Sequence, residues 1–416
     1  MTRSNLRIDA DRLWATLMES ARFGGTAKGG ICRLALSDED RRVRDWFVAA
    51  ARDAGLEVTI DDMGTIYALR RGRDMSKPPV AFGSHLDTQP TGGKFDGVLG
   101  VLGGLEVMRT LHDLGYETNA PLMLVNWTNE EGSRFAPAML GSGVYAGVFD
   151  RALADSREDR QGVRFAEAID SIGYRGEAEP GSVKFGAMFE LHIEQGPILE
   201  AEQKMVGVVT GVQGMRWYEI ELTGREAHTG STPMHLRANA LLGAARLIER
   251  VDAIAHAHAP AAVGTVGLVE VKPNSRNVIP GHVFFSVDFR HPEDAVLDRM
   301  ERELGEAVPV VAAELGLAAE LRKVWDSPAV RFDAACIEAV RVGAEKAGLS
   351  TRDMVSGAGH DAAYIARVAP TTMIFVPCEG GLSHNEAEST SFEECAAGAQ
   401  VLLNAVLEYD RRFTAA

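Results

Sequence analysis

The spacing of hydrophobic and polar residues divides the first half of the chain into alternating strands and helices. Short apolar runs typical of buried strands are separated by longer stretches with a helical period. Ser37 and Asp40 resemble a helix start, and Gly55 and Gly115 mark helix ends. We expect strands at residues 56–60, 65–71, 80–84, 121–127 and 186–194, and helices at 38–54 and 96–114. This alternation predicts an α/β fold with a mixed, mainly parallel sheet covered on both faces.

The pattern changes near residue 214. The segment predicts a strand at 216–224, a long helix at 236–258, strands at 264–271 and 282–290, a helix at 292–308 and a strand at 317–325. This order predicts a smaller α+β layer of the type βαββαβ, inserted into the first domain. We expect the insertion at 214–328 and the first domain at 1–213 and 329–416.

The end of the chain returns to the alternation of the first half. A helix is expected at 333–348, a strand at 371–377, and a last helix that begins with a capping box of Ser391 and Glu394. The sequence contains no internal repeat and no low-complexity linker, so we expect short hinges between the two domains.

Composition narrows the class of protein. The 416 residues are 46% hydrophobic and 25% charged, which is typical of a globular protein and long enough for two domains. The net charge of −16 argues against a nucleic-acid partner. No apolar stretch approaches the ~20 residues that span a membrane, and the N-terminus has no apolar signal region. Four scattered cysteines fit a reducing compartment, so we expect a cytoplasmic protein.

Histidines and carboxylates gather at the ends of the expected strands. His85, the adjacent pair Glu130 and Glu131, His192 and His384 each follow or end an apolar run. Taken singly, the segments of His85, His192 and His384 can also be interpreted as structural, with side chains that only form hydrogen bonds in loops. Together they indicate one site, because the carboxyl ends of strands in an open α/β sheet line one crevice.

The donor types indicate a metal site. Asp96 lies in a glycine-rich loop before a helix, and Asp87 follows His85 by two residues, where it can orient that ligand. Imidazole and carboxylate ligands without thiolate suit Zn²⁺, and also Mn²⁺, Co²⁺ or Ni²⁺. The donors exceed what one tetrahedral site requires, whereas two ions sharing a carboxylate use them all. One of the adjacent glutamates is then a ligand, and the other can accept a proton from water.

Other motifs carry less chemistry. The run GVLGVLGGLE does not match the GxGxxG dinucleotide pattern, and LGSGVYAG lacks the frame of a nucleophile elbow. His256 and His258 are expected on a helix surface, and nothing near His112 or His282 supports a role.

Five motifs run in order through both expected domains: HLDTQPTGGKFDG, NEEGSRF, HIEQGP, EAHTGSTPM and LSHNEAE. Together they resemble the amidase/hydantoinase/carbamoylase branch of the aminoacylase- and carboxypeptidase-like dinuclear metallohydrolases. That branch includes N-carbamoyl-L-amino-acid hydrolases, allantoate amidohydrolases and bacterial-type β-ureidopropionases.

The resemblance implies two divalent metal ions per chain, zinc above all, and a role for each residue of the site. The implied set is His85 and His192 on one ion, Glu131 and His384 on the other, Asp96 as the bridge, Glu130 as general base and Asp87 as the residue that orients His85.

The resemblance also implies how a substrate is held. The inserted layer is similar to the family's lid and dimerisation domain, which implies a homodimer. His228 would stabilise the oxyanion from its own subunit or across the dimer, and Asn277 and Arg290 would grip a substrate carboxylate. Gln195 and Gly359 would be further substrate contacts.

The implied activity is hydrolysis of the carbamoyl (ureido) C–N bond of N-carbamoyl-L-amino acids to amino acid, CO₂ and ammonia. Allantoate and β-ureidopropionate remain open as substrates, and a dipeptidase or aminoacylase activity is a more distant alternative. A metal-dependent binding protein without turnover is a different class of function. The second glutamate of the Glu130–Glu131 pair argues against it, because binding alone needs no general base.

Overall fold

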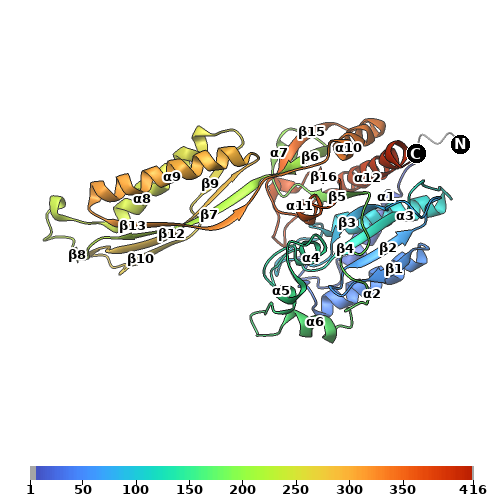
Figure 1. The fold of residues 1–416 in the computed structure, drawn as a ribbon, viewed down its shortest axis with the longest axis horizontal. Helices are drawn as coiled ribbons and strands as arrows, with labels where there is room; N and C mark the ends of the chain where they lie inside the picture. Colours follow the sequence, from blue (N-terminus) through green and yellow to red (C-terminus); the bar gives the residue numbers. More distant parts are fainter. Residues whose placement is uncertain (1–5, 415–416) are drawn as a thin grey trace. The chain divides into compact units, whose positions relative to one another are not determined.

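The computed structural model describes residues 6–414 of the chain. The chain divides into two compact units, one formed by Met1–Gly211 and Arg331–Ala416 and the other by Val212–Val330 (Figure 1). None of the helices in the described part of the chain combines the length and the apolar composition that crossing a membrane requires.

The first unit is built on a mixed sheet, whose order along the described chain is β1-β2-β4-β3-β5-β16-β6-β14, with β15 paired to β6. The strands β4, β3, β5 and β16 at its centre run parallel, whereas β1 pairs antiparallel with β2, β2 with β4, and β6 with β16. The bounds are β1 Glu57–Ile60, β2 Ile66–Arg70, β3 Val80–His85, β4 Leu122–Trp127, β5 Ala187–Ile193, β6 Val206–Val212, β14 Val330–Arg331, β15 Thr351–Ser356 and β16 Thr371–Val376. This sheet confirms the expected α/β fold.

Helices surround this sheet. They are α1 Ala10–Ser20, α2 Asp38–Asp53, α3 Val98–Asp113, α4 Leu140–Tyr145, α5 Arg151–Asp155, α6 Phe165–Ser171, α7 Ile198–Ala201, α10 Ala334–Ala347, α11 Asp361–Ile365 and α12 Phe392–Phe413, with a 3₁₀ turn, η2, at Glu379–Gly381. The expected caps are confirmed: the side chain of Ser37 accepts the amide of Asp40 at the start of α2, and Ser391 with Glu394 forms the capping box of α12.

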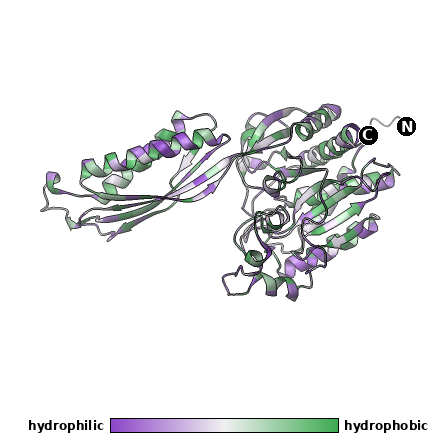
Figure 2. Ribbon diagram, viewed as in Figure 1, coloured by the Kyte–Doolittle hydropathy of each residue, from purple (hydrophilic) through white to green (hydrophobic). Residues whose placement is uncertain are grey.

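The central strands are buried along their whole length, which is why they read as continuous apolar runs (Figure 2). Strand β3 lies so close to β4 that a Cβ on Gly83 would stand 2.0 Å from the carbonyl oxygen of Val125. Gly83 also has a φ of 147°, which side chains rarely tolerate. The glycine therefore permits the close pairing that carries His85 to the carboxyl edge of the sheet.

The second unit is a separate antiparallel sheet, ordered β10-β12-β7-β13 with β9 on β12, and two long helices. Its elements are β7 Gly214–Thr223, β8 Ala227–His228, η1 Met234–Leu236, α8 Ala240–Ala257, β9 Val263–Thr265, β10 Val269–Lys272, β11 Val278–Ile279, β12 His282–His291, α9 Asp294–Leu315 and β13 Ala318–Ser327. Alternate residues of β7 and β12, such as Ile220 and Phe285, form its core with Leu247 of α8 and Met300 of α9.

Several details of the second unit differ from the expectation; helix α9, for example, continues to Leu315, past the expected end at residue 308. The single strand expected at 264–271 is two short strands, because β9 and β10 pair with different parts of β12. Helix α8 begins at Ala240 and not at residue 236, because the side chain of Asn239 caps it by accepting the amides of Leu241 and Leu242. The small pair of β8 and β11 was not expected from the sequence.

Candidate metal centre

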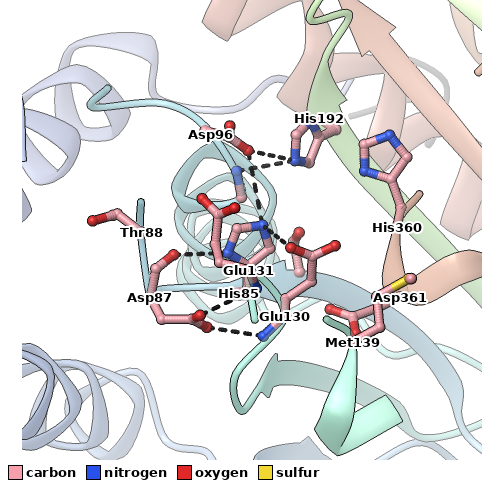
Figure 3. A network of polar contacts seen from close by, with 12 residues as sticks. His85, Asp87, Thr88, Asp96, Glu130, Glu131, Met139, His192, His360 and Asp361 are labelled. Carbon is pink, nitrogen blue, oxygen red and sulfur yellow. Dashed lines mark hydrogen bonds and ion pairs between the residues drawn. The ribbon is translucent and has the colours of Figure 1, made fainter. Parts of the chain in front are cut away.

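The four parallel strands at the centre of the first unit end around one site. His85 is the last residue of β3, Glu130 and Glu131 follow β4, His192 lies near the end of β5, and His384 follows β16. Because β4, β3, β5 and β16 are neighbours in the sheet, their carboxyl ends gather these side chains, as Figure 3 shows for all of them except His384.

The first group of potential ligands consists of His85, Asp96 and His192, all buried, with donor atoms within 4.8 Å of one another. The Nε2 atom of His192 lies 3.1 Å from Oδ1 of Asp96, and that of His85 lies 3.8 Å from the same oxygen. Although burial favours neutral imidazoles, the hydrogen bond to Asp96 raises the pKa of His192 to about 9, whereas burial lowers the pKa of His85 to about 4.

The second group consists of Asp96, Glu131 and His384, again with donor atoms within 4.8 Å. The Nε2 atom of His384 lies 3.4 Å from Oδ2 of Asp96 and 3.5 Å from Oε2 of Glu131. Asp96 therefore belongs to both groups, with one oxygen facing each. The side chain of His384 is 52% exposed, so this group lies at the open side of the site. The two triads of imidazole and carboxylate fit divalent metal ions that share Asp96.

Main-chain carbonyl groups orient both buried histidines. The Nδ1 atom of His85 lies 2.9 Å from the carbonyl oxygen of Asp87, and that of His192 lies 2.9 Å from the carbonyl oxygen of Ile193. When Nδ1 donates to these oxygens, Nε2 of each ring faces Asp96, and it can bind a metal ion once it carries no proton. The amide nitrogen of Gly97 lies 3.1 Å from the same Nε2 atom of His192.

Asp87 contacts the site through both its main chain and its side chain. Asp87 orients His85 through its main-chain oxygen, while its carboxylate accepts the amides of Glu130 and Glu131, each at 3.2 Å (Figure 3). A buried carboxylate is satisfied best by such donors. Asp87 therefore fixes both the histidine and the backbone of the glutamate pair.

The two adjacent glutamates have different surroundings. Oε2 of Glu130 lies 3.4 Å from Nε2 of His85, and burial together with the charge of Asp361 raises the pKa of Glu130 well above its usual range. Glu131 accepts hydrogen bonds from the amide and the side chain of Gln89, at 3.1 and 2.7 Å, and faces His384. The two carboxylates therefore have different neighbours, His85 for Glu130 and Gln89 with His384 for Glu131.

Two further residues that the resemblance implies lie in the first unit. Gln195 donates its amide to Oδ2 of Asp96 at 2.9 Å and to Ser383 at 3.2 Å, and its own Oε1 is buried without a hydrogen-bond partner among the described residues. Gly359 lies against Met139: a Cβ on the glycine would stand 3.2 Å from the methionine methyl group.

The remaining three belong to the second unit. His228 is exposed on β8, and its Nδ1 accepts the amide of Gly230 at 3.0 Å. Asn277 is close to it, because its carbonyl oxygen accepts the amide of Thr229 at 3.1 Å. Arg290 lies on β12, and its guanidinium group forms an ion pair of 2.8 Å with Asp288.

Several residues of the site were not found from the sequence. They are Glu190, His360, Asp361, Ser383 and Glu388. Glu190 is buried and accepts the hydroxyl of Ser84 at 2.6 Å and the amide of Ala362 at 2.9 Å. The ring of His360 packs edge-on against His192 with centroids 4.5 Å apart (Figure 3). A charged residue inside the apolar run FELHI was the available signal for Glu190.

Comparison with known proteins agrees with this geometry. The chain belongs to peptidase family M20/M25/M40, whose family model matches residues 81–408. It is 54% identical to the N-carbamoyl-L-amino-acid amidohydrolase of Rhizobium meliloti over 97% of both chains, and 38% identical to that of Paenarthrobacter aurescens over 97% of this chain and 99% of the relative. A solved amidase of the hydantoinase/carbamoylase family from Burkholderia multivorans superposes with a TM-score of 0.95, at 55% identity over 97% of this chain and 98% of that one. These findings confirm the family resemblance of the five motifs.

Proposed function

We propose that this protein is a metal-dependent amidohydrolase that cleaves the carbamoyl C–N bond of N-carbamoyl-L-amino acids. The observation that carries the proposal is the pair of ligand groups sharing Asp96, with Glu130 beside them. The names of the relatives at 54% and 38% identity support this substrate class. The reaction consumes water and yields the amino acid, CO₂ and ammonia.

The proposed centre holds two divalent ions, of which Zn²⁺ suits the donors best and Mn²⁺, Co²⁺ or Ni²⁺ also fit. His85 and His192 would hold one ion, Glu131 and His384 the other, and Asp96 both. Such ions, when bound, polarise a carbonyl group and make water more acidic.

In this proposal Glu130 moves the proton. Its carboxylate accepts a proton from the attacking water and returns it to the departing nitrogen. The 3.4 Å contact with His85 keeps the carboxylate at the first ligand group, and Asp87 holds its backbone.

Substrate contacts are assigned by the same reasoning. His228 would donate to the developing oxyanion, and Asn277 and Arg290 would bind the carboxylate, for which a guanidinium fork is better shaped than an ammonium group. Gln195 and Gly359 would line the site in the first unit. We further propose a cytoplasmic homodimer, in keeping with the scattered cysteines and with the likeness of the inserted unit to a dimerisation domain.

The test is an activity screen of protein incubated with Zn²⁺, Mn²⁺, Co²⁺ or Ni²⁺, using release of ammonia as the readout. The substrates are several N-carbamoyl-L-amino acids, allantoate and β-ureidopropionate, with an N-acetyl amino acid and a dipeptide as controls. We expect the highest kcat/KM for an N-carbamoyl-L-amino acid and loss of activity after chelation. Preference for allantoate or β-ureidopropionate would reassign the substrate, and turnover of the dipeptide alone would refute the proposal.

A further inference from the structure

A buried carboxylate, that of Glu388, contacts the loop of Asp96 without belonging to either group of potential ligands. Glu388 is 4% exposed, and its Oε1 accepts the amides of Phe95 and Asp96 at 3.0 and 3.1 Å. These amides belong to the loop that presents Asp96 in front of α3. Because buried amides require acceptors, Glu388 determines how the main chain of the shared ligand is held.

The other oxygen of Glu388 contacts the second ligand loop. Its Oε2 lies 3.0 Å from Oγ of Ser383, and the same hydroxyl lies 2.8 Å from Oδ2 of Asp96. Ser383 directly precedes His384, so one serine joins Glu388, the carboxylate of Asp96 and the histidine loop. Glu388 thus contacts the shared ligand twice, once at its backbone and once through a hydroxyl.

Two loops pack closely around the carboxylate of Glu388, one containing Gly93 and the other following His384. A Cβ on Gly93 would stand 2.1 Å from Glu388, so the glycine loop packs directly on the acid. His384 has a φ of 53°, a left-handed conformation that a residue other than glycine adopts only with support from its surroundings. The amide of Glu388 donates to the carbonyl of Asn385 at 3.0 Å, which closes the loop after His384.

We propose that Glu388, acting through Ser383, is a positioning residue that sets the metal affinity of this centre without binding metal itself. The inference rests on the proposed two-ion site. Loss of the Glu388 side chain should weaken the binding of both ions, because both would be held by Asp96. The ion at Glu131 and His384 should be affected more, because the loop that carries His384 also loses its contact with Glu388. Residues behind metal ligands typically change affinity about 10–100-fold.

The experiment titrates metal-free protein with Zn²⁺ against a chromophoric chelator, which measures both binding steps without substrate. The variants are Glu388→Gln, Glu388→Ala and Ser383→Ala, with Glu379→Gln as a control for loss of charge at an exposed position of the same segment. We expect Glu388→Ala to weaken the second Zn²⁺ about 10–100-fold and the first less. Ser383→Ala should weaken the second ion in the same direction. Glu388→Gln should bind Zn²⁺ with an affinity close to that of the wild type, because its amide oxygen can accept both backbone amides and its NH₂ group can face Ser383.

Each outcome decides the proposal. If Glu388→Ala binds both ions as wild type does, or if Glu388→Gln loses as much affinity as Glu388→Ala, the positioning role is wrong although the two-ion centre stands. If the wild-type protein binds fewer than two ions, the proposed centre itself fails and the inference with it. Circular dichroism of the metal-free variants checks folding, and if Glu388→Ala does not fold, Ser383→Ala alone carries the test.

Discussion

At the scale of single residues, the adjacent glutamates Glu130 and Glu131 show which properties of a site can be predicted from sequence and which cannot. The pair NEEG after an apolar run predicts one ligand and one base, but not which is which. The assignment by position came from family resemblance, and the directions of the two side chains depend on Asp87, Gln89 and His384, which are distant in the chain. Local pattern does not encode such contacts. Glu388 was not predicted as a residue of the site for the same reason, although it lies in the motif LSHNEAE: its contacts with the loop of Asp96 are distant in the sequence.

Substitution of the two glutamates should have different effects on metal content and on kcat. Glu130→Gln keeps the shape of the side chain but cannot accept a proton, so we expect both metals to bind while kcat falls about 10²–10⁴-fold. Glu131→Gln should lose one metal first, and added metal should restore part of its activity. Metal analysis beside steady-state kinetics separates them. The roles are exchanged if Glu130→Gln is the variant that lacks metal.

Asp96 occupies the other decisive position. Because it contributes to both ligand groups, Asp96→Ala should reduce the occupancy of both ions, whereas His384→Ala should reduce mainly one. Inductively coupled plasma analysis after dialysis against trace Zn²⁺ measures this as ions per chain. Two tightly held ions in Asp96→Ala would show that this carboxylate is not shared.

At the scale of elements, the sequence located those whose ends are set locally. Helices α2 and α12 begin at the expected caps because Ser37 and Ser391 bond to amides three residues onward. The strands β9 and β10 were merged in the expectation, since their separation depends on which part of β12 each one pairs with. Strand register of this kind is a tertiary property.

The turn between β1 and β2 carries a pH-dependent contribution to stability. Asp61 is buried, accepts the amides of Met63 and Thr65 at 3.0 and 2.9 Å, and accepts the hydroxyl of Tyr67 at 2.8 Å. Burial raises the pKa of Asp61 from 3.8 to about 7 despite these hydrogen bonds. The folded state thus holds the proton more tightly than the unfolded state, so this group lowers stability as pH rises from about 4 to 7.

Asp61→Asn should remove that dependence. The amide cannot ionise, its oxygen can still accept the backbone amides, and its NH₂ group can donate to the tyrosine oxygen. We expect the free energy of unfolding of the variant, relative to wild type, to increase between about pH 4 and pH 7 and then to stay level. Urea unfolding at several pH values measures this difference. Parallel stability curves for the two proteins would contradict it.

At the scale of the whole molecule, the expected homodimer is open to a direct test. The helices α8 and α9 of the second unit expose apolar side chains, among them Leu241, Leu242 and Val310, which suits a surface that a second copy covers. Light scattering at micromolar concentration should give twice the chain mass of 44.8 kDa. A constant mass of one chain across that range would argue against the dimer and against a role for His228 across it.

The second unit leaves and rejoins the first at neighbouring strands. Its chain departs after β6 and returns through β14, which are paired in one sheet, and the amide of Phe332 donates to the carbonyl of Thr210 at 3.0 Å beside them. A short turn could therefore join β6 to β14 directly, without the segment that lies between these two strands. A gene shortened in this way should yield a chain that assembles both ligand groups yet carries none of His228, Asn277 or Arg290. If His228, Asn277 and Arg290 bind the substrate as we propose, such a chain should bind metal and lose turnover, which separates the residues of the chemical step from those of substrate recognition.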